Sequence, residues 1–264
     1  MLKMRIVRKQ TPKDMAAAAV DIYAAECLRV VESGRDFIVA LSGGETPLVF
    51  FGLLAVASRL SSSVWKKTHI FWVDERCVST EDSASNYGNA KRVLLDHVPI
   101  DPGNIHRMPS ELSPEDGAFF YQKELIKFFG CETGGIPRFD LVVLGVGSDG
   151  HVASLFPGSA PAVEDGRLVM AVKGGEPDVW RLTLTLPVLN AAAHVIILAS
   201  GRKKAPVVRA LLGRSGWKPV ARKVRPKSGV ISLVIDETAA GEFAAGGFEE
   251  HPAREEELSG NKTR

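Results

Sequence analysis

Cysteine is scarce in this sequence of 264 residues, and the three that occur follow no pattern. Cys27, Cys77 and Cys131 are odd in number and far apart, so they make neither a disulfide framework nor a cysteine-rich zinc site. The six histidines are equally scattered, without the short spacings of metal ligands, and no bound metal is expected. Unpaired cysteines are typical of a reducing compartment, so we expect the protein to be cytoplasmic.

Long apolar runs and a strong net charge are also absent. No stretch approaches the roughly 20 apolar residues that cross a bilayer, and the basic N-terminus lacks the apolar core of a secretory signal. The formal net charge is only +2, and no nucleic-acid-binding module is recognisable. We therefore expect neither a membrane nor a nucleic acid as partner. We also expect a small-molecule ligand, and a monomer or at most a weak dimer.

What the chain does contain is an alternation of apolar, β-branched runs with helical patterns. The predicted strands are 37–41, 69–73, 139–145, 168–172, 181–185, 194–199 and 230–235, and the predicted helices are 13–32, 47–60, 86–96, 114–129 and 203–212. Continuous apolar strands such as FDLVVLG are typical of a parallel sheet buried on both faces.

This alternation predicts the α/β class. We expect a single domain over residues 1–240, built on a mostly parallel, Rossmann-like twisted sheet that helices cover on both faces. Residues 241–264 are rich in Gly and Glu, and they are predicted to form a disordered tail without a catalytic role. Ligands of such open sheets bind beyond the carboxyl ends of the strands, so polar segments directly after predicted strands are the candidates for a site.

The first such segment is Ser42-Gly43-Gly44, between a predicted strand and a predicted helix. The two glycines allow a close approach of the backbone, and Thr46 is predicted to cap a helix that begins at Pro47. A helix N-terminus favours a bound phosphate, whereas an ordinary strand-to-helix turn has the same pattern, and the loop alone leaves both readings open.

Charged residues make up two further candidates. Asp74-Glu75-Arg76 ends a predicted strand, and Asn86 follows soon after. Arg181 and Lys204 lie near other predicted strand boundaries. A polyol and a phosphate suit Asp74-Glu75-Arg76, but taken alone this segment is better explained as a surface salt-bridge cluster. Arg181 and Lys204 could each be a plain surface charge, and spacing alone leaves this open.

The fourth segment reads Gly145-x-Gly147-x-x-Gly150, the spacing of a dinucleotide-binding turn. That turn requires a full helix after the third glycine, and here Phe156-Pro157-Gly158 stops a helix within two turns. The alternative is a tight turn that presents His151 as a general base, oriented by Asp149. The sequence has no Gly-x-Ser-x-Gly nucleophile motif, so direct attack by a water that His151 activates is favoured.

Ten Lys or Arg residues and no Asp or Glu lie between Arg202 and Lys227. A solvated surface, a positive field that attracts an anionic ligand and a nucleic-acid contact are three possible readings. The single aromatic in this run, Trp217, argues against the third.

Five segments in order, SGGETP, VDERCVSTEDSASNYG, LGVGSDGHVASLFPGS, RLTLTLPVLNAA and SGVISLVIDETAA, resemble the 6-phosphogluconolactonase family over about residues 6–240. The resemblance implies hydrolysis of 6-phospho-D-glucono-1,5-lactone, no cofactor and no metal, and a fold shared with glucosamine-6-phosphate deaminase. By motif matching it implies that His151 is the base and that Asp149 assists it. The substrate-binding residues that it implies are Ser42, Gly43, Gly44, Asp74, Arg76, Asn86, Arg181 and Lys204.

Three rivals stay open at this point. Glucosamine-6-phosphate deaminase is expected to carry a glutamate after the Asp-Gly-His turn, where this chain has Ser154-Leu155-Phe156-Pro157. A sugar-phosphate-sensing domain would need no base, and about 36 residues before the first core strand leave no room for a helix-turn-helix. An NAD-dependent oxidoreductase is the third.

Overall fold

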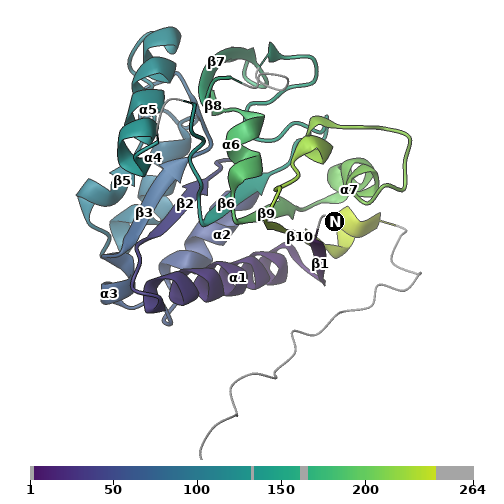
Figure 1. The fold of residues 1–264 in the computed structure, drawn as a ribbon. Helices are drawn as coiled ribbons and strands as arrows, with labels where there is room; N and C mark the ends of the chain where they lie inside the picture. Colours follow the sequence, from purple (N-terminus) through teal and green to yellow (C-terminus); the bar gives the residue numbers. More distant parts are fainter. Residues whose placement is uncertain (1–2, 132–133, 161–165, 242–264) are drawn as a thin grey trace, which may run out of the picture.

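The structure is a computed structural model, and it describes residues 3–131, 134–160 and 166–241. In this part of the chain, seven strands form one sheet whose neighbouring strands are all parallel (Figure 1). From edge to edge they are β1 (Lys3–Lys9), β10 (Val230–Asp236), β9 (His194–Ala199), β6 (Leu141–Gly145), β2 (Phe37–Leu41), β3 (Thr68–Trp72) and β5 (Ile105–His106). The prediction of a mostly parallel sheet is confirmed. The predicted tail spans residues 241–264, and all of it except Gly241 lies outside the described residues.

Helices cover both faces of this sheet, as predicted. His194 of β9 lies against Glu26 of α1 (Pro12–Glu32), with 3.1 Å between Nδ1 and Oε1. The next residue, Val195, points to the opposite face, on which Phe71 packs against Phe128 of α5 (Pro114–Phe129) with ring centroids 5.0 Å apart. Figure 1 shows α1 below the sheet and α5 above it. The other helices are α2 (Glu45–Ala55), α3 (Ser62–Trp65), α4 (Asn86–Val93), α6 (Leu186–Ala191), α7 (Ala205–Leu211) and α8 (Glu237–Ala240).

A second, antiparallel sheet of three strands was not predicted. Its order is β4 (Asp74–Arg76), β8 (Val179–Leu184) and β7 (Val169–Gly174). The strands predicted at 168–172 and 181–185 are therefore real, but they belong to this sheet and not to the main one. The chain enters it directly from β3, and the antiparallel register sets Arg76 opposite Arg181.

Three predicted helices have different bounds. The helix expected at 47–60 begins at Glu45 and ends at Ala55, so Thr46 is not its cap; Gly44 takes that position with φ +101°, a conformation that favours glycine. The helix expected at 86–96 stops at Val93, before a 3-10 turn. The helix expected at 203–212 begins with a 3-10 turn over Arg202–Lys204 that leads into α7.

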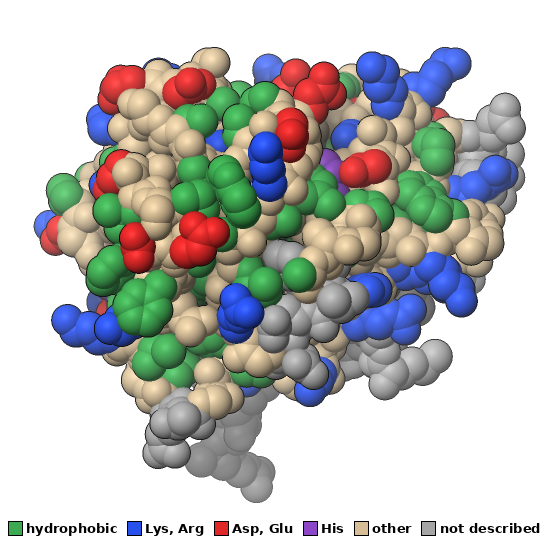
Figure 2. Space-filling model, turned by 90° about the horizontal axis from the view of Figure 1, so that it is seen from above, with side chains coloured by type: hydrophobic (Ala, Val, Ile, Leu, Met, Phe, Trp, Pro, Cys, Tyr) green, Lys and Arg blue, Asp and Glu red, His purple; other side chains and the backbone are tan. Residues whose placement is uncertain are grey.

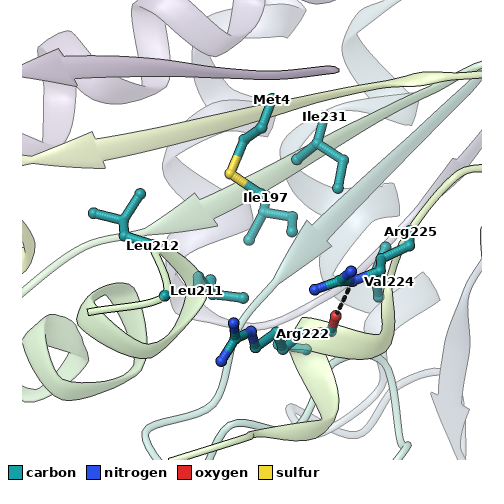
Figure 3. A pocket seen from close by; sticks show the side chains of 10 residues that line it. Met4, Ile197, Leu211, Leu212, Arg222, Val224, Arg225 and Ile231 are labelled. Atoms are coloured by element: carbon teal, nitrogen blue, oxygen red, sulfur yellow. Dashed lines mark hydrogen bonds between the residues drawn. The ribbon is translucent and has the colours of Figure 1, made fainter. Parts of the chain in front are cut away.

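A small apolar cavity of about 160 Å³ lies between α7 and the sheet (Figure 3). Its apolar lining includes Met4, Ile197, Leu211 and Ile231. Arg225 and Arg222 lie at its edge, and Arg225 Nε donates to the Arg222 carbonyl at 3.1 Å. Met4 and Ile231 stand near the amino ends of their strands, so this gap belongs to the packing of α7 and not to a ligand site at the carboxyl ends.

Candidate active site

The predicted site residues meet at the carboxyl ends of β2, β6 and β9, which are neighbours in the sheet. A cavity of about 430 Å³ opens there. It is lined by nine of the ten predicted residues, namely Ser42, Gly43, Gly44, Asp74, Arg76, Asn86, His151, Arg181 and Lys204. Asp149, the tenth, lies directly beside His151. Segments that are up to 162 positions apart, from Ser42 to Lys204, therefore form one site.

The stretch after β6 folds as a tight turn. Gly150 N–H donates to the Gly147 carbonyl at 3.0 Å, and Gly147 N–H donates to the His151 carbonyl at 2.8 Å. Residues 146–159 form turns and a single bridge between Val152 and Leu155, with no helix. The glycine spacing of a dinucleotide site is present, but the helix that such a site requires is absent from these described residues.

Gly147 is needed for steric reasons. A Cβ at this position would lie 2.2 Å from His151 Nδ1 and 2.3 Å from Asp149 Oδ1. Real Cβ atoms do not come so close to other heavy atoms, so any larger residue would push the pair apart. The sequence pattern favoured a tight turn that presents His151, and the structure shows why residue 147 of that turn is glycine: it leaves room for the side chains of Asp149 and His151.

His151 and Asp149 form a hydrogen-bonded pair. Asp149 Oδ1 lies 2.6 Å from His151 Nδ1, and a carboxylate can only accept, so Nδ1 carries the proton. The other ring nitrogen, Nε2, is then the basic one. The imidazole packs against the Phe156 ring, with centroids 5.1 Å apart. Both members of the pair are partly exposed, with 34% of the His151 side chain and 52% of the Asp149 side chain accessible. A solvent water can therefore reach the base.

A second set of contacts joins the Ser42–Gly44 loop to β4. Asn86 Nδ2 donates to the Asp74 carbonyl at 2.9 Å and to Asp74 Oδ1 at 3.2 Å. A Cβ at Gly43 would lie 2.0 Å from Asn86 Oδ1, so the loop can approach Asn86 only because residue 43 is glycine. Ser154 Oγ donates to Asp74 Oδ2 at 2.7 Å. Asp74 is thus held by groups from α4 and from the His151 turn.

The cations of the cavity are crowded and partly buried. Arg181 Nε donates to the Gly174 carbonyl at 2.7 Å, and its guanidinium lies 5.7 Å from the centre of the Phe156 ring. Burial first, and then the charge of Arg76, lower the pKa of Arg181. Burial also lowers the pKa of Lys204. Burial removes part of the hydration of these cations and makes their charged forms less stable. A bound anion compensates for the lost hydration, so the partly buried cations favour anion binding.

Sequence reasoning missed several residues. Glu75 is buried, and it accepts hydrogen bonds from the backbone N–H groups of Arg76, Asn86 and Tyr87 at 2.7 Å each. Its carboxylate therefore ties the start of α4 to β4. In the sequence, Glu75 belongs to the charged segment directly after the strand predicted at 69–73, and an acidic residue there requires partners if it points inward.

Arg202 and Lys203 also line the cavity, next to Lys204. The count of basic residues indicated a positive field, but not which members of the run face the site. Figure 2 shows Lys and Arg side chains gathered on the side of the molecule where α7 lies in Figure 1.

Among the residues that the structure describes, no group of three His, Cys, Asp or Glu side chains could hold a metal ion. Within those same residues, no helix combines the length and the apolarity that crossing a membrane requires.

Residues 10–233 match the family described as "Glucosamine-6-phosphate isomerases/6-phosphogluconolactonase". The chain belongs to this family. Within it, the chain is 43% identical to a 6-phosphogluconolactonase of Synechocystis sp. over 177 residues, which cover 66% of this chain and 70% of that one. It is 33% identical to the 6-phosphogluconolactonase of Rattus norvegicus over 234 residues, or 87% of this chain and 90% of the relative.

Solved structures agree with the fold. A 6-phosphogluconolactonase from Trypanosoma cruzi superimposes with a TM-score of 0.83 at 28% identity, covering 92% of this chain and 98% of that one. A monomeric glucosamine-6-phosphate deaminase superimposes with a TM-score of 0.71 at 20% identity, covering 90% of this chain and 99% of that one. The second likeness is one of fold alone, and it confirms the predicted kinship of the two folds.

Proposed function

We propose that the protein hydrolyses 6-phospho-D-glucono-1,5-lactone to 6-phosphogluconate, the second step of the oxidative pentose phosphate pathway. The observation that carries the proposal is the 2.6 Å contact of His151 with Asp149 at a cavity lined by Arg76, Arg181 and Lys204. A base beside a cluster of cations suits a substrate that is both a phosphate dianion and an ester. Relatives at 33–43% identity carry the name of this lactonase.

The reaction needs one base and one water. His151 Nε2 takes a proton from water as the water oxygen attacks the lactone carbonyl, which gives a tetrahedral oxyanion. When the carbonyl re-forms, the bond to the ring oxygen breaks, and the imidazolium returns its proton to that oxygen. The product carboxylic acid then loses a proton to solvent. The Asp149 carboxylate stabilises the imidazolium between these two transfers.

Other residues hold the substrate in place. We assign the phosphate and hydroxyl groups to Arg76, Arg181, Lys204 and the Ser42–Gly44 loop, with Asp74 and Asn86 at the polyol. Guanidinium groups and backbone N–H groups are the usual donors to phosphate, and carboxylates and amides bind sugar hydroxyls. Anchoring the dianion leaves the lactone carbonyl to be aligned with His151.

The test is the His151→Ala variant. We expect its rate to fall about a hundredfold or more, the scale for a removed general base. The rate is followed by NMR on freshly prepared lactone, corrected for spontaneous hydrolysis. The control is His97→Ala, which removes an exposed histidine in the 3-10 turn after α4 that does not line the cavity, and it is expected to keep full activity. Turnover by His151→Ala close to that of the wild type would refute the assignment.

Two rival activities are distinguished by direct assay. Incubation with glucosamine 6-phosphate should release no ammonia, because Ser154-Leu155-Phe156-Pro157 stands where the deaminase is expected to carry its glutamate, and none of these four residues is a carboxylate. A sensing domain would show no turnover with either substrate. Calorimetric titration with NAD or NADP should show no tight binding. The cytoplasmic location of the protein, and its state as a monomer or at most a weak dimer, remain predictions.

A further inference from the structure

Phe156 touches two side chains that have tasks in the proposed function, although it does not itself line the cavity. The centre of its ring lies 5.1 Å from the centre of the His151 imidazole and 5.7 Å from Cζ of the Arg181 guanidinium. At that distance an aromatic ring attracts a cation. One ring therefore contacts both the base and a cation of the phosphate site.

The ring of Phe156 is held from its backbone and from a neighbouring loop. The N–H and the hydroxyl of Ser159 donate to the Phe156 carbonyl at 3.0 Å and 2.8 Å. A Cβ at Gly174 would lie 3.3 Å from Cδ2 of Phe156, and a Cβ at Gly175 would lie 2.9 Å from its Cζ. The ring is therefore packed against the loop that joins β7 to β8 as well as against His151.

Arg181 depends on the same loop. It is buried, and its Nε and Nη2 donate to the carbonyls of Gly174 and Pro177 at 2.7 Å and 3.2 Å. A Cβ at Gly175 would lie 2.8 Å from Nη2 of Arg181. The loop thus determines where the guanidinium lies, and the Phe156 ring links this loop to the turn that carries the base.

The base needs such a neighbour because burial does not hold it. Of the His151 side chain 34% is accessible, and of the Asp149 side chain 52%. Their hydrogen bond determines which nitrogen carries the proton, but the tilt of a partly exposed imidazole is fixed only by packing. An error of about 1 Å in the position of a reacting group can cost about a hundredfold in rate.

We propose that Phe156 is a positioning residue that sets the distance between the base His151 and the phosphate-binding Arg181, and thereby selects lactones with a phosphate remote from the carbonyl. The inference rests on the proposed function and adds to it a residue that determines specificity. A phosphorylated lactone is held at both ends, so the separation of the two side chains decides whether its carbonyl meets the activated water. A lactone without phosphate needs only the base, and it depends less on Phe156.

The test compares two substrates on Phe156→Leu, which removes the ring and keeps an apolar side chain. Steady-state rates are measured on fresh 6-phospho-D-glucono-1,5-lactone and on D-glucono-1,5-lactone, both corrected for spontaneous hydrolysis. We expect kcat/KM to fall about thirtyfold for the phosphorylated lactone and about threefold for the free one, so that the preference for the phosphate falls about tenfold. The control is Phe119→Leu, at an exposed phenylalanine of α5 outside the cavity, and it should change neither value.

Gly175→Ala is a second variant, which displaces the ring without removing it. Its methyl group would press on both Phe156 and Arg181. Gly34→Ala introduces similar backbone strain, with φ +87° against +83°, but into open space. We expect Gly175→Ala to lower the preference for the phosphorylated lactone about tenfold and Gly34→Ala to leave it unchanged.

Calorimetry with 6-phosphogluconate tests the contact with Arg181 without turnover. Phe156→Leu should weaken binding about threefold in the wild-type background, the scale of a lost cation–π contact. It should cause no further weakening in the Arg181→Gln background, because the ring acts through the guanidinium. Equal weakening in the two backgrounds would indicate a general packing effect and overturn the proposal.

The kinetic outcomes are equally decisive. Equal losses of kcat/KM for the two lactones in Phe156→Leu, or no loss for either, would overturn the proposal. If the wild type hydrolyses only the phosphorylated lactone, the calorimetric comparison with Arg181→Gln decides. If the wild type hydrolyses neither lactone but binds 6-phosphogluconate, the lactonase proposal fails, and the same comparison still decides this one. A wild type that does not bind 6-phosphogluconate would overturn both.

Discussion

Asp149 and His151 form one hydrogen-bonded unit, in which the carboxylate determines which imidazole nitrogen carries the proton. The two residues are two positions apart, and the turn between them is closed by hydrogen bonds of Gly147 and Gly150. A pair so close in sequence needs no long-range packing to find its geometry. This explains why its members could be recognised before the fold was known.

Asp149→Asn tests the carboxylate. The amide oxygen can still accept from Nδ1, but it has no charge to stabilise the imidazolium, so we expect the turnover number to fall at least about tenfold. The KM should change little, because Asp149 does not line the cavity. Steady-state kinetics on fresh lactone measure both values. An unchanged turnover number would mean that the pair is only structural.

We expect Lys204 to lower the free energy of unfolding and to strengthen substrate binding. Burial lowers the pKa of its ammonium, so the charged form is less favourable in the folded protein than in the unfolded chain. We therefore expect Lys204→Met to raise the melting temperature at neutral pH and to weaken binding of 6-phosphogluconate about tenfold or more. Lys227→Met, which removes an exposed lysine, is the control and should change neither property. A variant that loses stability together with affinity would contradict this account.

At the scale of elements, the turn after β6 depends on glycines for two different reasons. Gly150 has φ +82°, which favours glycine through backbone conformation. Gly147 is not among the residues with positive φ, and only the side chains of Asp149 and His151 exclude a larger residue there. Substitution at Gly147 should therefore act on the catalytic pair rather than on the backbone.

Gly147→Ala and Gly34→Ala form a matched pair of substitutions. Gly34 follows α1 with φ +87° and has open space around its Cα, so alanine there should lower the free energy of unfolding by roughly 1 kcal/mol and leave turnover intact. Gly147→Ala should lower turnover about tenfold or more and change stability less. Thermal denaturation and kinetics on both variants provide the comparison. If Gly147→Ala and Gly34→Ala changed turnover equally, the proposed steric role of Gly147 would be refuted.

At the scale of the whole molecule, we expect pH to affect stability through two histidines at one edge of the sheet, on β3 and β5. His69 Nδ1 lies 3.1 Å from His106 Nε2, and His106 Nδ1 lies 2.8 Å from Glu124 Oε1. Burial first, and then the neighbouring His106, lower the pKa of His69, while Asp36 and Asp101 oppose them. The folded protein thus binds a proton at His69 less readily than the unfolded chain does.

This difference in the pKa of His69 makes the free energy of unfolding depend on pH. The pKa of His69 is lower in the folded protein than in the unfolded chain, where it is about 6.5. Above that pH neither state is protonated at His69 and stability is complete. Below it the unfolded chain binds the proton more readily, so the free energy of unfolding falls. We expect His69→Gln to reduce this loss, and His97→Gln, at an exposed position, to leave it unchanged. Urea denaturation at pH values from about 7.5 to 5 measures the slopes. Identical slopes for wild type and His69→Gln would rule out a contribution from His69.

Much of the main sheet followed from local patterns. The strands at 37–41, 194–199 and 230–235 are apolar runs that can be buried only between two layers of helices, so their place in a parallel sheet could be inferred. The existence of a separate three-stranded sheet could not be inferred in this way. Residues 168–172 are apolar like the strands of the main sheet, whereas residues 181–185 alternate polar and apolar side chains. What separates both from the main sheet is the antiparallel register of β8 with β4 and β7.

The sequence by itself determined the α/β class, the residues at the strand ends, and the coupling of Asp149 to His151, because each of these depends on neighbours in the chain. Only the tertiary structure decided that Arg76 lies opposite Arg181, that Gly43 lies against Asn86, and that Trp217 touches Gly150. These contacts join segments tens of residues apart. The order and register of the strands determine these contacts, and no local pattern in the sequence specifies strand order or register.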